Sequence, residues 1–192
     1  QALRGWAFEH QKLFMGSIAV IENGVATNRL FVAFPDGKLQ WYDKRHLFAM
    51  AKEDQFYNAG KERLIIEYLG WRICPLICYD LRFPVFSRNT DAYDLLIYVA
   101  NWPGKRISAW DALLTARAIE NQCYVVAVNR VGVDGNGWEF PGHSQMVNPL
   151  GERILMAPPK EEIVLGKISA QLLKTTRESL PFLQDRDNFE LK

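Results

Sequence analysis

The chain has 192 residues, of which 48% are hydrophobic and 23% are charged, as expected for one globular domain. Lys and Arg (23) nearly balance Asp and Glu (22), and a net charge of +1 leaves no electrostatic footprint for nucleic acid or for an anionic membrane. No apolar run approaches the roughly 20 residues that a membrane span needs.

The first half of the chain reads mainly as strands. Apolar residues at helical spacing predict a helix over residues 2–13. Turn signals at Asn23-Gly24 and at Pro35-Asp36-Gly37 separate runs rich in β-branched and aromatic residues. We therefore expect strands over residues 13–22, 27–34 and 38–42, followed by a loop over residues 50–60.

The second half alternates strands with one clear helix. A helix over residues 107–122 is predicted to present one apolar face, made of Trp110, Leu113, Leu114, Ala118 and Ile119. The tail after Ser169 is polar and is expected to pack on a partner or to wrap the surface. The remaining predicted strands are residues 63–68, 71–78, 94–100, 123–129, 142–151 and 162–168. Several of these strands are apolar on both faces, which predicts an α/β fold with layered sheets.

Cysteine and histidine usage limits the chemistry that the chain can carry. An odd number of cysteines with no CxxC pair argues against a disulfide framework and fits a reducing cytoplasm, so we expect a cytoplasmic protein. The histidines are too few for a His-based metal site, unless most of them converge, and we expect no metal. The residues concerned are Cys74, Cys78, Cys123, His10, His46 and His143.

Cys78 ends a buried strand where the chain turns towards a helix. Such a turn exposes a side chain while neighbouring backbone N–H groups point at whatever it attacks, so Cys78 is a candidate nucleophile. The alternative is an unreactive core cysteine, because free cysteine is among the most buried residue types. The rest of the sequence decides between these interpretations.

Several separated motifs, in order, resemble the nitrilase superfamily of carbon–nitrogen hydrolases, and within it the omega-amidase-like branch. They are residues 42–48 (YDKRHLF), 77–84 (ICYDLRFP), 101–103 (NWP), 116–122 (ARAIENQ) and 142–151 (GHSQMVNPLG). The resemblance implies a four-layer α-β-β-α sandwich of two sheets. It also implies a homodimer or larger homo-oligomer, and chemistry that requires no metal or organic cofactor.

The same resemblance assigns three catalytic residues. Cys78 matches the nucleophile, Lys44 the catalytic lysine, and Glu53 a second glutamate that precedes a glycine, here Gly60, by seven residues. An ammonium near a thiol lowers the thiol pKa and can stabilise an oxyanion, for which the backbone N–H of Tyr79 would be a second donor. A carboxylate near Lys44 would keep the ammonium in place. The alternatives are a solvated lysine and an exposed loop glutamate.

Three further residues are expected to contact substrate. Arg82 matches a position thought to hold the distal carboxylate of the substrate, which a guanidinium can bind in a bidentate manner. Its alternative role is a structural salt bridge with Asp80 or Glu120. Asn101 and Trp102 end a strand beside the expected pocket, where Trp102 either walls the pocket or belongs to the core. His46 and His143 match no catalytic position and are expected to satisfy backbone partners.

One catalytic residue of the family is not identifiable in the sequence. The family's general-base Glu comes from an early strand and loop, whereas Glu9 and Glu22 fall outside the matching motif. We therefore expect residues 1–192 to be a single carbon–nitrogen hydrolase domain that lacks its N-terminal strand and the loop with this Glu.

The expected function is hydrolysis of a small carboxylate-bearing amide through a cysteine thioester, with release of ammonia. A nitrilase or an N-carbamoyl hydrolase of the same superfamily, or a non-catalytic oligomeric binding subunit, remains the alternative.

Overall fold

Three parallel strands lie at the centre of a six-stranded sheet in the computed structural model, which describes residues 1–190. These strands are β5 (Trp71–Ile77), β6 (Leu95–Ala100) and β7 (Tyr124–Asn129), and their side chains are mostly apolar and buried. Because each is buried on both faces, each reads as a continuous apolar run. Three antiparallel strands complete this sheet, namely β4 (Ile66–Tyr68), β10 (Gln145–Val147) and β11 (Arg153–Met156). The order of the six strands across the sheet is β11-β10-β7-β6-β5-β4.

A second sheet is an antiparallel meander at the start of the chain. It contains β1 (Phe14–Glu22), β2 (Val25–Ala33) and β3 (Leu39–Asp43) in that order. Asn23 and Gly24 both have positive φ, at 52° and 78°, which makes the two-residue turn that fits the twist of a β-hairpin. Leu30 and Val32 of β2 are fully buried in the core that both sheets share.

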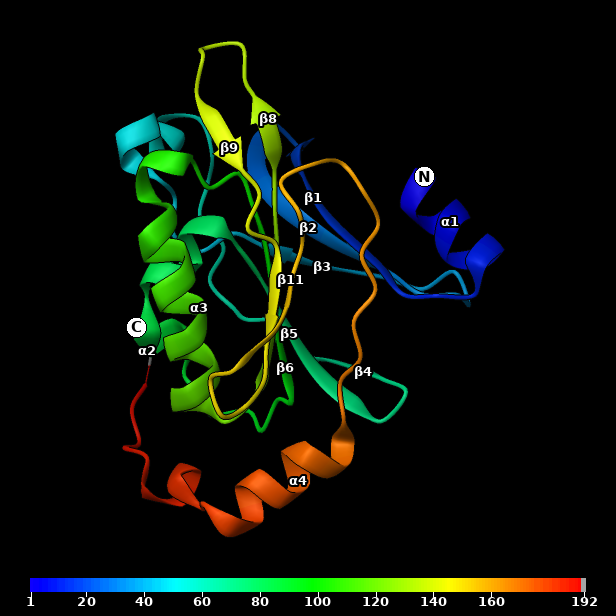
Figure 1. Cartoon of the computed structure of the whole chain (residues 1–192). Coiled ribbons are helices and arrows are strands. Elements are labelled where there is room, and N and C mark those ends of the chain that lie inside the picture. The colour runs from blue at the N-terminus through cyan, green and yellow to red at the C-terminus, as the bar shows by residue number, and fades with distance from the viewer. Residues whose placement is uncertain (191–192) are drawn as a thin grey trace.

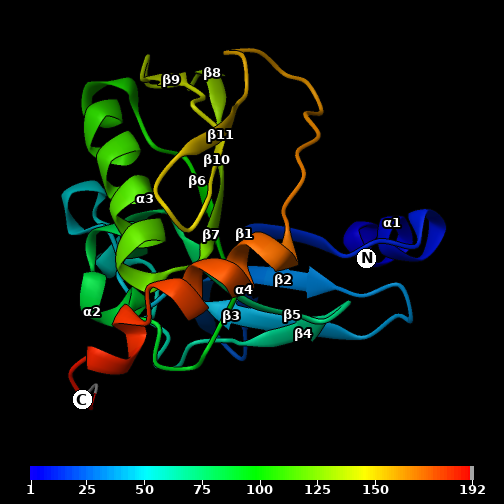
Figure 2. The same cartoon turned by 60° about the horizontal axis from the view of Figure 1, so that its bottom comes forward.

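Helices lie outside the two sheets (Figure 1). α2 (Pro84–Ser87) and α3 (Ile107–Asn121) cover one face of the six-stranded sheet, while α1 (Ala2–His10) contacts β1 and β2. α4 (Ala170–Ser179) crosses the bottom of the molecule in Figure 1 and comes forward in Figure 2. The predicted α/β sandwich of two sheets is confirmed.

Short elements complete the chain. β8 (Val131–Val133) and β9 (Glu139–Pro141) form a small hairpin that the sequence interpretation missed. The 3₁₀ helices are Ala49–Ala51, Glu53–Gln55, Cys78–Arg82, Gly104–Arg106 and Phe182–Asp185. Within the described residues, no helix is both long and apolar enough to cross a bilayer.

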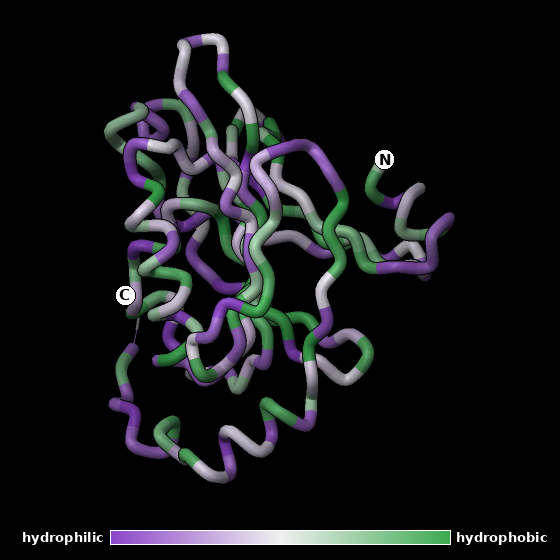
Figure 3. Tube along the Cα trace, viewed as in Figure 1, coloured by the Kyte–Doolittle hydropathy of each residue, from purple (hydrophilic) through white to green (hydrophobic). Residues whose placement is uncertain are grey.

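Two element predictions need correction. Residues 162–168 form no strand, because no strand in the described part of the chain pairs with them. Figure 1 draws this segment as a loop that leads to α4, and the tube of Figure 3, in the same view, is green at its apolar residues. The outward position of Ile119 shows that the apolar face of α3 is narrower than predicted. The tail wraps the surface, one of the two arrangements expected for it, and forms the helix α4, with Ser169 as its N-cap and an Arg177–Asp94 ion pair at 2.7 Å.

Candidate active site

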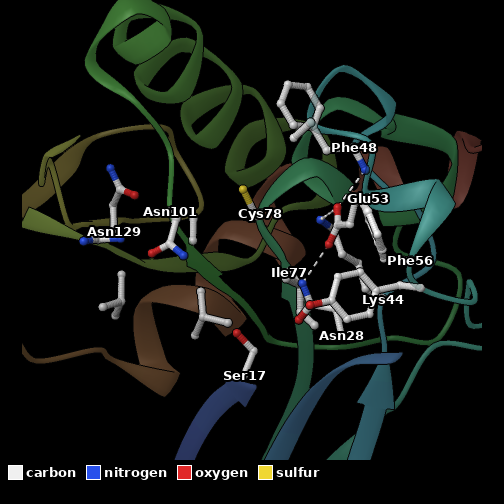
Figure 4. Close-up of a pocket in the computed structure, with 16 residues that line it drawn as sticks. Ser17, Asn28, Lys44, Phe48, Glu53, Phe56, Ile77, Cys78, Asn101 and Asn129 are labelled. Carbon is white, nitrogen blue, oxygen red and sulfur yellow. Dashed lines mark hydrogen bonds and ion pairs between the residues drawn. The ribbon is translucent and has the colours of Figure 1, made fainter. Parts of the chain in front are cut away.

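The carboxyl ends of the three central strands meet at one edge of the sheet. Cys78 directly follows β5, Asn101 directly follows β6, and Asn129 ends β7. Ligands of open α/β sheets bind at this kind of edge. A cavity of about 570 Å³ opens there, and Figure 4 shows these three side chains around it together with Lys44 and Glu53.

Cys78 has an unusual backbone. Its φ is +45°, in the left-handed region that a residue with a Cβ rarely adopts. This angle turns the chain abruptly from β5 into the 3₁₀ helix Cys78–Arg82. The backbone N–H of Tyr79 lies in the first turn of that helix, where N–H groups have no acceptor within the helix. The turn thus presents a thiol beside a backbone donor.

Lys44 and Glu53 form a tight ion pair at the same cavity. Lys44 directly follows β3, and its Nζ lies 2.5 Å from Oε2 of Glu53. The two side chains are only 4% and 12% exposed, so Lys44 is not a solvated lysine and Glu53 is not an exposed loop residue. A pair this buried is only weakly screened by solvent and salt.

Glu53 receives two further hydrogen bonds. The side-chain amide of Asn28 donates to Oε1 at 2.9 Å, and the backbone N–H of Phe48 donates to Oε2 at 2.7 Å. Burial raises the pKa of Glu53 and is the largest single effect. The hydrogen bonds from Lys44, Asn28 and Phe48 together outweigh it, so the pKa lies below its usual range. Glu53 is therefore a charged anchor for Lys44.

The Cys78 thiol is subject to opposing effects. Burial raises its pKa, while the Lys44 ammonium and the backbone N–H of Asn101 lower it. Burial is the larger effect, and the pKa lies above its ordinary value. The expectation that a nearby lysine lowers the thiol pKa is correct for the effect of Lys44 alone. It does not give the net shift of the pKa, which is upward because of burial. The resting thiol keeps its proton at neutral pH.

Asp80 ties the Cys78 turn to the Lys44 loop. Its carboxylate is fully buried and accepts hydrogen bonds from the Tyr42 hydroxyl (2.8 Å), the Ile77 N–H (3.0 Å) and the His46 N–H (3.1 Å). His46 Nδ1 also lies 2.8 Å from this carboxylate, and its ring stacks on Phe83. The interpretation of His46 as bound to the backbone was therefore wrong, because its partner is a carboxylate.

His143 needs the same correction. Its Nδ1 lies 3.0 Å from the Asp111 carboxylate, away from the cavity.

Arg82 lines a smaller cavity that also borders Cys78 and that Lys44 does not reach. Its guanidinium lies 4.9 Å from the Trp102 ring centroid and makes no ion pair with a described residue. The proposed salt bridge of Arg82 to Asp80 or Glu120 is wrong, because the Asp80 carboxylate is bonded as above and Glu120 pairs with Arg117 at 2.9 Å.

Trp102 is both wall and core. It is 3% exposed and packs on Trp110, yet it lines a small cavity that also contains Cys78 and Asn101. Its backbone N–H donates to the Asn129 side chain at 2.6 Å, and its indole N–H donates to the Arg106 carbonyl at 2.8 Å. Trp102 thereby fixes the loop after β6 against the end of β7.

Several residues around the cavity escaped the sequence interpretation. Asn129 had a usable signal, because it ends a buried parallel strand. Asn28 and Phe48 had none, since each reaches Glu53 only through the fold. The other residues that line the cavity include Ser17, Phe56 and Arg130.

Glu53 is the only carboxylate among the described residues that line the cavity. Glu9 is exposed on α1, and Glu22 pairs with Arg29 at 3.1 Å. In the described part of the chain, no group of three or more His, Cys, Asp or Glu side chains is placed to hold a metal ion.

Comparison with known proteins places this geometry among relatives. A family model described as carbon-nitrogen hydrolase matches residues 1–178. The omega-amidase YafV of Escherichia coli K12 is 51% identical over 180 residues, which cover 93% of this chain and 70% of that protein. The 2-oxoglutaramate amidase of Bacillus subtilis is 38% identical over 173 residues, which cover 88% of this chain and 66% of that protein.

A solved structure gives the same result. The crystal structure of XC1258 from Xanthomonas campestris, a CN-hydrolase superfamily protein with an arsenic adduct in its active site, is 46% identical with a TM-score of 0.97. The match covers 99% of this chain and 75% of that one.

Proposed function

Because this chain belongs to the carbon–nitrogen hydrolase family, we propose that it is an amidase that releases ammonia from the ω-amide of a small carboxylate-bearing molecule. The observation that carries this proposal is the cavity that Cys78 shares with the buried Lys44–Glu53 pair. The omega-amidase and 2-oxoglutaramate amidase named above support the choice of substrate class.

The reaction follows from the placement of these groups. A base removes the Cys78 proton as sulfur attacks the amide carbon, so a C–S bond forms and the carbonyl becomes an oxyanion. The Lys44 ammonium and the Tyr79 N–H stabilise that oxyanion. The C–N bond then breaks as the nitrogen receives a proton. Ammonia departs, and the acyl group remains on Cys78 as a thioester. Water hydrolyses the thioester to a carboxylate and restores the thiol.

Glu53 is poorly suited to be the base. Its lowered pKa makes it a weak proton acceptor, and three donors already occupy it. We infer that the base is a different carboxylate, and no other carboxylate lines the cavity in the described part of the chain. General acid–base catalysis contributes roughly 10²- to 10⁴-fold. Without such a carboxylate, the site should hydrolyse amides slower by about that factor.

Two further expectations belong to this proposal. The three free cysteines, Cys74, Cys78 and Cys123, favour a reducing compartment such as the cytoplasm. We also propose a homodimer or larger homo-oligomer, for which light scattering after gel filtration is the test.

Ammonia release by the complete natural protein tests the function. The panel contains ω-amides with a distal carboxylate, uncharged amides of equal length, nitriles and N-carbamoyl compounds. We expect the carboxylate-bearing amides to react fastest and Cys78→Ala to abolish turnover while the thermal unfolding temperature changes little. If Cys78→Ala keeps more than a few per cent of the rate, the thioester mechanism is wrong.

A further inference from the structure

A second, smaller cavity also borders Cys78, and Lys44 is not among the residues that line it. Its volume is about 40 Å³, and one water-sized group needs roughly 10–15 Å³, so it has room for about three such groups, the size of a carboxylate. It is lined by Phe48, Cys78, Tyr79, Arg82, Asn101, Trp102, Pro103 and Arg106. This space is therefore suited to the head group of a substrate whose amide carbon lies at the thiol.

The lining of this cavity carries two positive charges and no negative one. Arg82 and Arg106 are both half-buried, and no carboxylate is among the residues that line the cavity. In the part of the chain that the structure describes, neither guanidinium makes an ion pair. Two partly desolvated cations without a counter-charge attract an anion.

Both guanidinium groups are held by aromatic rings. Arg82 lies 4.9 Å from the Trp102 centroid, and Arg106 lies 5.2 Å from the Phe48 centroid. Stacking on a ring occupies the face of a guanidinium and leaves the N–H groups at its edge free to bind a planar anion. The two arginines are thus oriented without losing the donors that a carboxylate would use.

Arg106 is also fixed through its backbone. Its N–H donates to the Pro103 carbonyl at 3.0 Å, and its carbonyl accepts the Trp102 indole N–H at 2.8 Å. The ring that supports Arg82 is thus hydrogen-bonded to the backbone of Arg106. Arg106 also lines the neighbouring outer cavity of about 440 Å³, so it stands where that space meets the inner one.

We propose that Arg106 is a specificity-determining residue, which forms with Arg82 a two-guanidinium subsite for the substrate carboxylate. This inference rests on the proposed amidase function and deepens it. Both arginines bind the same carboxylate, Arg82 from the side of Trp102 and Arg106 from the side of Phe48. The bound carboxylate then sets the distance of the amide carbon from Cys78.

Kinetics of the complete natural protein test the proposal. The variants are Arg106→Met, Arg106→Lys, Arg82→Met and the double Met variant, assayed with glutaramate and with uncharged pentanamide. We expect each single Met variant to lower kcat/KM for glutaramate on the order of 10- to 100-fold and to leave pentanamide within a few-fold. The double variant should lose less than the product of the single losses, and Arg106→Lys should recover part of the loss.

Lys105→Met is the matched control. Lys105 precedes Arg106 and carries the same charge, but it lines a different cavity. Its Nζ lies 4.8 Å from the centroid of the Trp138 ring. Its removal should change kcat/KM for glutaramate by less than a few-fold. If Lys105→Met lowered kcat/KM for glutaramate as much as Arg106→Met does, the effect would come from the overall positive charge of the protein. That result would overturn the proposed subsite.

A second readout does not depend on turnover. Glutarate, which has no amide, should slow alkylation of Cys78 by iodoacetamide in the unaltered protein and should not do so in Arg106→Met. Equal protection in both proteins would overturn the proposal, as would equal kinetic losses on both substrates. If the unaltered protein hydrolyses no amide in the panel, the proposed function fails, while protection by glutarate still decides the role of Arg106.

Discussion

Cys78 is held in a state that needs help to react. Burial raises its pKa more than the Lys44 ammonium and the Asn101 N–H lower it, so Cys78 rests as a thiol. Lys44 therefore does not generate a stable thiolate, and its ammonium is paired with the Glu53 carboxylate 2.5 Å away. In the mechanism that we propose, a base takes the proton of Cys78, while Lys44 stabilises the oxyanion.

The raised pKa predicts the pH dependence of alkylation in residues 1–192. Only the thiolate reacts, so the rate with iodoacetamide should rise with pH and reach half its maximum above about 8.5, the ordinary cysteine value. Lys44→Met removes a group that lowers the pKa and should move the midpoint higher. Cys78→Ala gives the background from Cys74 and Cys123, which are fully buried. A plateau reached below pH 8 would contradict the raised pKa.

Glu53 predicts the pH dependence of stability. Its pKa is lower in the folded protein than the roughly 4.3 of an unfolded chain. The charged Glu53 therefore makes its full contribution to stability when the pH is above the unfolded-state pKa. This contribution is lost as the pH falls through the folded-state pKa. Glu53→Gln should cost about 1–3 kcal/mol of unfolding free energy near neutral pH, and the difference should shrink below about pH 4.

Urea unfolding at a series of pH values measures this difference. Glu67→Gln is the control, because Glu67 pairs with Arg72 at an exposed position where an ion pair contributes little. A Glu53→Gln deficit that stays constant into acid would show that the lost stability comes from packing and not from charge.

At the scale of elements, the loop that carries Glu53 is fastened to the end of β3. The Gly60 N–H donates to the Lys44 carbonyl at 2.9 Å, and a Cβ at Gly60 would lie 2.0 Å from the Asp43 carbonyl oxygen. Only glycine allows this approach. The loop therefore cannot take a side chain at this position without displacing the residue beside Lys44.

Gly60→Ala should accordingly affect both fold and activity. We expect a loss of about 1–3 kcal/mol in unfolding free energy from overpacking, and a fall in kcat/KM on the order of 100-fold from the displaced Lys44. Thermal unfolding and ammonia release by the complete natural protein are the measurements. Gly135→Ala, where a Cβ meets nothing within 4 Å, should change neither. Full activity in Gly60→Ala would show that the Lys44 position tolerates this shift.

The sequence predicts elements well where local pattern and tertiary burial agree. β5, β6 and β7 are read correctly because each is buried on both faces, and the hairpin at Asn23-Gly24 follows from turn chemistry. Residues 162–168 have the pattern of a strand, but a pattern cannot reveal whether a neighbouring strand is available. The β8–β9 hairpin was missed although Gly135 and Gly137 mark its turn.

For the site, motifs locate the residues and the fold supplies their environment. Cys78 and Lys44 are recognisable from the chain, and Glu53 from its spacing to Gly60. The pKa shifts of Cys78 and Glu53 cannot be predicted from the sequence, because the burial that raises the Cys78 pKa and the Asn28 bond to Glu53 arise from segments distant in sequence. Arg106 has no motif signal and is found only through the cavity that it shares with Arg82.

At the scale of the whole molecule, two of the stretches that expose apolar side chains could pair with another chain. On β1, which pairs only with β2 among the described residues, Ile18 and Ile21 are exposed. In the segment after β11, Ile163 and Leu165 are 92% and 88% exposed. A sheet edge with free backbone groups and an extended apolar segment are both templates for pairing with another chain.

Residues 1–192 made on their own should therefore self-associate. Sedimentation velocity should show a weight-average mass that rises with protein concentration. The double variant Ile163→Lys and Leu165→Lys should reduce this association, because charged side chains oppose edge pairing. Met50→Lys is the matched control, since Met50 is 83% exposed but lies in the 3₁₀ helix Ala49–Ala51, beside the outer cavity of about 440 Å³. Monomers at every concentration would contradict self-association altogether. An equal effect of Met50→Lys would contradict pairing through the segment after β11, because general surface charge would then explain the loss of association.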